Sequence, residues 1–221
     1  MNTSVGGAGR LLWAALRALI VLTLLAGVIY PLAVTGIGQG LFSDRANGSR
    51  IEEDGRVVGS RLIGQRYELP LKKGEDTPRP DLRWFQPRPA NGLGTNSVNT
   101  QYALILSGAT NRSGDNPELL RWVEEARAAV VRDNSTPRYR VDPARVPADA
   151  VTSSGSGLDP DISPAYARLQ VHRVAEHNGL PVGRVAQLVA RHTDGRVLGF
   201  LGEPRVNVLE LNVALREMTG G

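Results

Sequence analysis

The first forty residues of the chain differ sharply in hydropathy from the rest. Residues 18–43 carry no charge, and Arg10 and Arg17 are the only charged residues before them. A helix needs roughly 20 apolar residues to cross a hydrocarbon core of about 30 Å, and residues 11–34 are sufficient for that. Arg17 lies near enough to the end of this stretch for its side chain to reach the interface. The pattern therefore predicts one transmembrane helix at residues 11–34.

The charges beside this span predict its orientation. Both arginines lie on its amino side, whereas residues 36–43 are uncharged. Positive flanks stay in the cytoplasm, so we expect residues 1–10 to be cytoplasmic and residues 35–221 to form one extracytoplasmic domain. A cleaved signal peptide would have an apolar core of roughly 7 to 15 residues, which is shorter than this run. Tyr30 and Pro31 stand where an aromatic anchor and a helix end are expected, which favours a retained anchor.

Beyond the span, apolar residues at helical spacing predict three helices, the first two of which begin at capping residues. Asn116 and Ser163 are typical N-caps, each followed by a proline at the first helical position. The predicted helices run from 117 to 133, from 164 to about 179 and from 181 to about 191. A last short helix is expected to follow 206–211 and to end before Gly220.

The remaining apolar segments predict strands and loops. Val57, Val58 and the residues up to 63 indicate a strand and a turn, and residues 197–201 indicate a buried strand. Residues 69–100 are rich in Pro, Gly and Asn and predict a long irregular loop. The loop contains Trp84 and Phe85, for which contact with a partner and packing inside the domain are both open. Together these elements predict a mixed α/β domain.

Composition and charge exclude some functions. Beyond the two N-terminal arginines, 24 basic residues face 22 acidic ones, which gives no reason to expect nucleic acid as a partner. The chain has no cysteine, which suits a domain outside the cytoplasm that uses no disulfide. No phosphate-binding loop with its lysine and no nucleophile elbow is present. His172 and His177 are five residues apart, which does not fit a metal pair on one helix face.

One segment, at residues 146–164, has two interpretations. Its glycines and serines would let a ligand approach the backbone closely, and N–H groups ahead of the helix at Pro164 could hold an anion. The same Asp and Ser residues could equally form turns and cap that helix.

Several segments resemble, in the same order, the C chain of the bacterial potassium-transporting ATPase, the KdpC family. In one-letter code these are YPL at 30–32, GSRLIGQ at 59–65, FQPRP at 85–89, VTSSGSGL at 151–158, DPDISP at 159–164, RVA at 173–175 after Gln170, and GEPRVNVLELN at 202–212. They are spread over nearly the whole chain.

The resemblance implies an α+β accessory subunit of a potassium uptake pump, a single-pass protein of the bacterial cell membrane. Its partners would be a potassium-selecting channel-like subunit, an ATP-hydrolysing P-type subunit and a small single-span peptide. The sequence DKTGT, expected at the phosphorylated aspartate of the hydrolysing subunit, is absent here. No catalytic residue is therefore expected in this chain.

The resemblance also implies a catalytic chaperone that raises the ATP affinity of the hydrolysing subunit. No firmly bound cofactor and no metal are expected, but ATP contact is implied for Ser153, Ser154, Gly155, Ser156, Gly157 and Gln170. The predicted orientation puts these residues across the membrane from cytoplasmic ATP. We therefore favour a domain that caps the potassium-selecting subunit and stabilises the complex.

Two alternatives come from other classes of protein. A membrane-anchored extracytoplasmic ligand-binding sensor would need a sizeable concave apolar pocket. A membrane-anchored enzyme would need a pocket that contains a carboxylate with a perturbed pKa.

Overall fold

A computed structural model describes residues 5–74, 78–91, 93–95 and 105–220 of the chain. The chain divides into two compact units, Met1–Arg50 and Ile51–Gly221, which are described separately.

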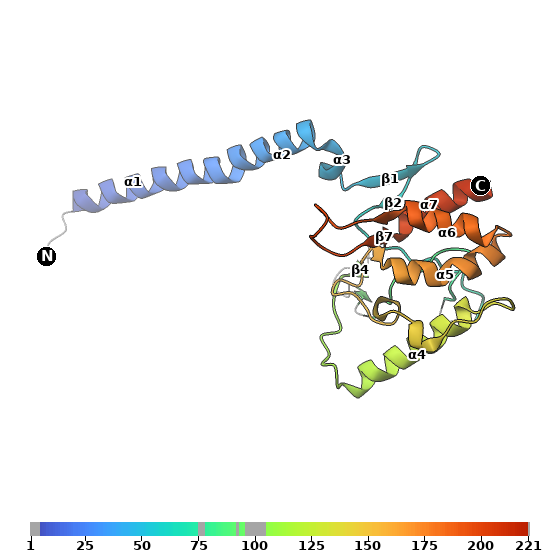
Figure 1. The fold of residues 1–221 in the computed structure, drawn as a ribbon. Helices are drawn as coiled ribbons and strands as arrows, with labels where there is room; N and C mark the ends of the chain where they lie inside the picture. The colour runs from blue at the N-terminus through green and yellow to red at the C-terminus, as the bar shows by residue number, and fades with distance from the viewer. Residues whose placement is uncertain (1–4, 75–77, 92, 96–104, 221) are drawn as a thin grey trace. The chain divides into compact units, whose positions relative to one another are not determined.

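The first unit is dominated by one long apolar helix (Figure 1). Its parts are α1 (Val5–Leu24), a π-helical turn (Leu25–Ile29) and α2 (Tyr30–Leu41), and the short helix α3 (Ser43–Ala46) follows. The stretch Gly7–Leu41 has 35 residues that are apolar enough to cross a membrane, and none of its most apolar part is buried. At a rise of 1.5 Å per residue it is about 52 Å long, which exceeds a hydrocarbon core of about 30 Å.

The expected helix end at Pro31 is wrong, because the helix continues through the proline to Leu41. Proline lacks the N–H of a regular helix, and its ring clashes with the carbonyl four residues earlier. The wider π-helical turn directly before it relieves this conflict, since Tyr30 donates its N–H to the carbonyl of Leu25, five residues back. Pro31 therefore modifies the helix without ending it.

The second unit is a mixed α/β domain with three small sheets (Figure 1). β1 pairs with β2, β3 pairs antiparallel with β4, and a three-stranded antiparallel sheet has the order β5-β7-β6. The strands are β1 (Arg50–Glu53), β2 (Arg56–Ser60), β3 (Gly94–Thr95), β4 (Ile105–Leu106), β5 (Asp161–Ile162), β6 (Thr193–Asp194) and β7 (Arg205–Asn207). The helices are α4 (Pro117–Asn134), α5 (Pro164–His177), α6 (Val182–Arg191) and α7 (Val208–Thr219), with 3-10 turns at Pro143–Arg145 and Ala148–Ala150.

The three predicted helices α4, α5 and α6 are confirmed, with the expected caps at Asn116 and Ser163, whereas α7 begins at Val208, within the stretch 206–211 that the sequence places before it. The Asn116 side chain accepts hydrogen bonds from the N–H groups of Glu118 and Leu119, at 3.0 and 3.1 Å. Ser163 Oγ accepts one from Tyr166 N–H at 3.0 Å. The last helix, α7, ends at Gly220, whose φ of +86° is easily reached by glycine.

The core is built mostly from aliphatic side chains of α5, α6, α7 and the sheet between them. Phe85, from the irregular region, is fully buried in this core, and Trp84 packs against it. The two alternatives for this aromatic pair are thus resolved in favour of packing inside the domain. The Trp84 ring also lies beneath the guanidinium of Arg216, 5.1 Å from its centroid.

The prediction of a buried strand at 197–201 is wrong. Only Val197 and Leu201 pair, across a tight turn, and the apolar side chains of this segment are exposed. Leu198 and Gly199 both have positive φ, 54° and 83°, so the backbone reverses direction where an extended strand was expected. Apolar composition does not lead to burial in this segment.

Candidate functional site

Gln170, on α5, is fully buried and is bound to the backbone of the irregular region. Its Oε1 accepts a hydrogen bond from Gln86 N–H at 2.7 Å, and its Nε2 donates one to the Gln86 carbonyl at 3.0 Å. The side-chain amide therefore pairs with both polar groups of one residue, as a neighbouring strand would. Such pairing satisfies buried backbone groups in a segment without regular secondary structure.

Asn212, on α7, holds the preceding residue in the same way. Its Oδ1 accepts from Phe85 N–H, and its Nδ2 donates to the Phe85 carbonyl, both at 2.9 Å. Two consecutive residues of the irregular region are thus fixed by amide side chains from two different helices. This arrangement determines where Phe85 enters the core.

Arg173, one turn after Gln170, is the third group that holds this region. It is 1 % exposed. Its Nη1 donates to the carbonyls of Leu82 and Trp84 at 2.8 and 3.0 Å. Nε donates to Asn134 Oδ1 at 2.9 Å, and Nη2 donates to Gln170 Oε1 at 2.6 Å.

All four acceptors of Arg173 are neutral oxygens. Burial lowers the pKa of Arg173 to about 10, because desolvation disfavours the charged form. At neutral pH the side chain is still charged, and its charge is satisfied by carbonyl and amide dipoles. We call Gln170, Arg173 and Asn212 the brace.

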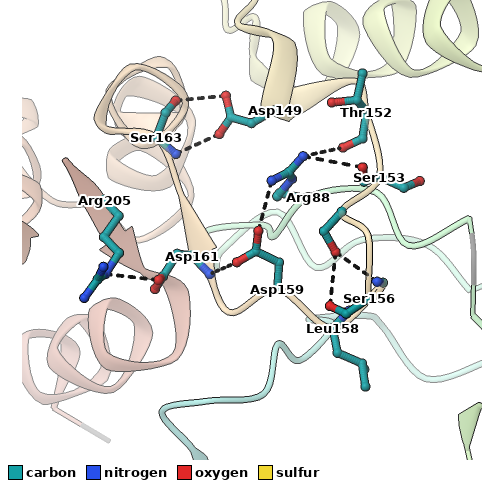
Figure 2. Close-up of polar contacts among 12 residues, drawn as sticks. Arg88, Asp149, Thr152, Ser153, Ser156, Leu158, Asp159, Asp161, Ser163 and Arg205 are labelled. Carbon is teal, nitrogen blue, oxygen red and sulfur yellow. Dashed lines mark hydrogen bonds and ion pairs between the residues drawn. The ribbon is translucent and has the colours of Figure 1, made fainter. Parts of the chain in front are cut away.

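The glycine-serine loop at residues 153–157 contacts the end of the same irregular region (Figure 2). Ser153 Oγ accepts a hydrogen bond from Asn91 N–H at 3.1 Å. Arg88 donates to Asp159 Oδ2 at 2.9 Å and, more weakly, to the carbonyls of Thr152 and Ser153 at 3.4 and 3.5 Å. The loop and the brace therefore hold the two ends of residues 82–91.

The hydroxyls of Ser154 and Ser156 accept hydrogen bonds from N–H groups of the loop and its next residue. Ser154 Oγ accepts from Gly157 N–H at 2.9 Å, and Ser156 Oγ accepts from Leu158 N–H at 3.0 Å. Gly157 has a φ of +70°, and a Cβ there would lie 2.8 Å from Leu93 Cδ2. Glycine is required at this position for both backbone conformation and close packing.

The carbonyl of Ser156 joins the loop to another segment. It accepts hydrogen bonds from Gly108 N–H at 3.1 Å and from Ser107 Oγ at 2.9 Å. On the opposite side, Gly64 N–H donates to the carbonyl of Leu158 at 2.8 Å. The loop is therefore a junction between three parts of the domain.

The groups at the start of α5 hold an anion that belongs to the same chain, the carboxylate of Asp149. The carboxylate of Asp149 accepts hydrogen bonds from Ser163 N–H at 2.7 Å and Ser163 Oγ at 2.9 Å, directly at the amino end of α5 (Figure 2). A negative charge is favourable there because of the helix dipole. The chain thus supplies this anion from its own sequence.

A hollow of about 490 Å³ lies between the glycine-serine loop and the irregular region. Its lining is mostly apolar and contains one ion pair, Arg88 with Asp159. The lining residues are Ile63, Gly64, Gln65, Arg66, Pro87, Arg88, Ala90, Leu93, Gly157, Leu158 and Asp159.

The carboxyl whose pKa is most relevant to an enzymatic role is Asp161. Burial raises its pKa, while Arg205 and the amide of Asn207 oppose that rise. Its two oxygens accept from Asn207 Nδ2 and Arg205 Nε, both at 3.2 Å. Asp161 does not line the hollow described above. Within the described ranges, no group of three or more His, Asp or Glu side chains is placed to hold a metal ion.

The residues implied to contact ATP differ in how accessible they are. Gly155 and Ser156 are exposed, whereas Gln170 is fully buried and its amide oxygen already accepts two hydrogen bonds. Direct contact between Gln170 and a nucleotide would require residue 86 to move away. Nucleotide contact at Gln170 and at the loop stays a prediction.

Arg173, Asn212 and Asp149 are site residues that the sequence does not single out. Arg173 and Asn212 lie within longer segments that match the family, and Asp149 lies in a loop. Apart from the bond from Arg173 to Gln170, three residues away, the hydrogen bonds described for them span 14 to 127 residues of sequence. Local pattern carries no signal for such contacts, although a polar residue on the apolar face of a predicted helix is a useful hint.

Comparison with known proteins identifies the family to which this chain belongs. The family model described as "K+-transporting ATPase, c chain" matches residues 12–217. A potassium-transporting ATPase KdpC subunit of Streptomyces avermitilis is 72% identical over 218 residues, which are 99% of this chain and 98% of that protein. Proteins of the same name from Kineococcus radiotolerans and Mycobacterium tuberculosis are 48% and 43% identical, and cover 91% and 93% of this chain and 90% and 97% of their own lengths. The chain belongs to the KdpC family, the c chain of the K+-transporting ATPase, and is a membrane-associated subunit of a potassium pump.

Proposed function

We propose that this chain is a non-catalytic accessory subunit of an ATP-driven potassium uptake pump, which it stabilises and helps to assemble. The observation that carries the proposal is that the polar side chains at the candidate site form hydrogen bonds within the domain. The brace and Ser153 hold residues 82–91 by hydrogen bonds, and the other polar groups of the glycine-serine loop bind the loop itself and residues 107–108. Together with the absence of DKTGT from the sequence, this supports a role in contacts between subunits, with ATP hydrolysis in another chain.

The proposed topology follows the charges beside the span. Residues 1–10 are cytoplasmic, residues 11–34 cross the bilayer, and residues 35–221 lie outside the cytoplasm. Arg10 and Arg17 support this orientation because basic flanks remain on the cytoplasmic side. The helix is longer than the hydrocarbon core, and tilt or extension of its ends into the headgroup region would accommodate the excess.

The proposed partners are the potassium-selecting channel-like subunit, the ATP-hydrolysing P-type subunit and a small single-span peptide. The extracytoplasmic domain would cap the potassium-selecting subunit, and the apolar helix would pack against the membrane helices of its partners. Small residues on this helix, such as Ala14, Ala18 and Gly27, support close helix packing in lipid.

A role as catalytic chaperone remains compatible with this topology only through an indirect effect. A domain outside the cytoplasm acts on ATP affinity through a coupling free energy between distant sites, typically about 1 to 3 kcal/mol. Such coupling would pass through the interface between subunits.

Two measurements test the proposal. The full chain, co-expressed with the other subunits, is expected to co-purify with the ATP-hydrolysing subunit, and its deletion is expected to reduce the yield of assembled pump. A reporter enzyme active only outside the cytoplasm, fused after Met218, is expected to be active. Activity of a cytoplasm-only reporter at the same position would overturn the topology. Direct contact between this domain and ATP would then be possible.

A further inference from the structure

The connection between β6 and β7 carries a group of exposed apolar side chains. Leu198 and Phe200 are 79 % and 67 % exposed, and their neighbours Val197 and Leu201 are also exposed. The connection projects from the domain beside β7 (Figure 1). We call residues 197–201 the apolar hairpin. Four large apolar residues within five positions, none of them buried, add little to the stability of the domain through burial.

The backbone of the apolar hairpin forms a tight turn. Val197 and Leu201 exchange two backbone hydrogen bonds, each of 2.9 Å. Between them Leu198 has a φ of +54° and Gly199 a φ of +83°. The left-handed region disfavours a leucine, whereas glycine or asparagine adopts it readily. A strained leucine that is also exposed is therefore not explained by folding, and such strain is often associated with a functional site.

The charged groups at the base of the hairpin pair with one another and include no surplus of basic residues. Arg196 pairs with Glu203 at 2.7 Å. Arg205 pairs with Asp161 at 3.2 Å and lies 3.9 Å from Asp194, so two arginines face three carboxylates. A surface that binds anionic lipid headgroups carries a surplus of basic residues, and this one does not. An apolar tip on ion-paired groups without surplus positive charge fits an uncharged apolar pocket of another protein.

We propose that the apolar hairpin is a docking element that inserts Leu198 and Phe200 into an uncharged apolar pocket on another subunit of the pump. The proposal rests on the proposed function, because it takes the partner to be a pump subunit. The hairpin is suited to this role since β6 and β7 both belong to the three-stranded sheet, which fixes its base. Exposed aromatic and aliphatic side chains on a rigid support are typical centres of protein interfaces.

The test uses the full chain co-expressed with the other subunits. Changing both Leu198 and Phe200 to Ser is expected to reduce retention of the chain on the captured hydrolysing subunit at least about tenfold, as for an interface hot spot. The matched control Val57→Ser removes an exposed apolar side chain from β2 and is expected to change retention little. If the wild-type chain fails to co-purify, the proposed function is wrong; if it co-purifies and the double variant does so equally, the docking role is wrong.

A second variant separates docking from folding. Leu198→Asn suits the left-handed backbone, so it is expected to leave the melting temperature of the chain unchanged or higher while weakening retention. Retention that stays at the wild-type level would overturn the proposal.

The partner can be identified by site-specific crosslinking, because the natural chain contains no cysteine. Leu198→Cys, labelled with a photoreactive maleimide, is expected to crosslink to another pump subunit. A crosslink only between two copies of this chain would overturn the choice of partner. Phe200→Trp in vesicles of brominated lipid tests insertion into the bilayer, and extra quenching beyond that of the wild-type chain would likewise contradict the proposal.

Discussion

Replacing Gln170 with alanine removes the amide that pairs with residue 86. The change eliminates two hydrogen bonds to the Gln86 backbone and one from Arg173. The bonds to the backbone contribute about 1 kcal/mol each and the bond from the guanidinium about 2 kcal/mol, with the buried partners left unsatisfied. We therefore expect the variant to lose about 4 kcal/mol in free energy of unfolding. For a domain of this size the melting temperature should fall by about 8 to 16 °C.

The assay is thermal and denaturant unfolding of the full chain in detergent micelles, followed by tryptophan fluorescence. Trp84 reports on the affected region, since it packs against the core beside Phe85. The matched control is Gln187→Ala, which removes an exposed glutamine from the middle of α6. The control is expected to stay within about 0.5 kcal/mol of the wild-type chain.

A loss below about 1 kcal/mol for Gln170→Ala, no larger than that of the control, would be the opposite outcome. Such a result would mean that the backbone of residue 86 finds other partners at no cost. The brace would then not determine the position of Phe85.

Two further predictions concern other contacts of the domain. The hydrogen bond from Arg83 lowers the pKa of Asp81 below its usual 3.8, so the stability gained from that carboxylate is present above about pH 4 and is lost as the pH falls through the lowered value. The melting temperature of Asp81→Asn should therefore fall less than that of the wild-type chain from about pH 5 to about pH 3, and parallel curves would contradict this. Gly64→Ala would place a Cβ 2.5 Å from the backbone oxygen of Asp159, and we expect a loss of about 1 to 3 kcal/mol in the free energy of unfolding. The control is Gly183→Ala on α6, where a Cβ would meet open space, and this change should stabilise the domain or be neutral. Equal losses at the two glycines would show that the close approach at Gly64 does not cause the loss of stability.

Elements with local signals were predictable from the sequence. Asn116 and Ser163 identified the starts of α4 and α5, because an N-cap acts on N–H groups two or three residues away. The first apolar helix was recognisable from length and charge alone. In each case the physical cause lies within one or two turns of the chain.

Features that depend on distant contacts or on unusual backbone were not predictable. In the brace, Gln170 binds a residue that is 84 positions away in the sequence, and Asn212 binds one that is 127 positions away. No local pattern reveals such contacts. The π-helical turn before Pro31 and the positive φ of Leu198 are backbone adjustments that residue preferences argue against. Apolar composition alone could not separate the buried strand β7 from the exposed hairpin before it.

We propose that Gln170 and the glycine-serine loop support the fold and assembly of the subunit and do not contact ATP. The ATP dependence of potassium-stimulated hydrolysis by purified pump containing Gln170→Ala, normalised to the amount of chain per hydrolysing subunit, tests this proposal. We expect a lower yield of assembled pump and an unchanged KM for ATP in the pump that does assemble. A raised KM in the assembled pump, together with saturable ATP binding by the folded wild-type chain that is lost in Gln170→Ala, would overturn the proposal.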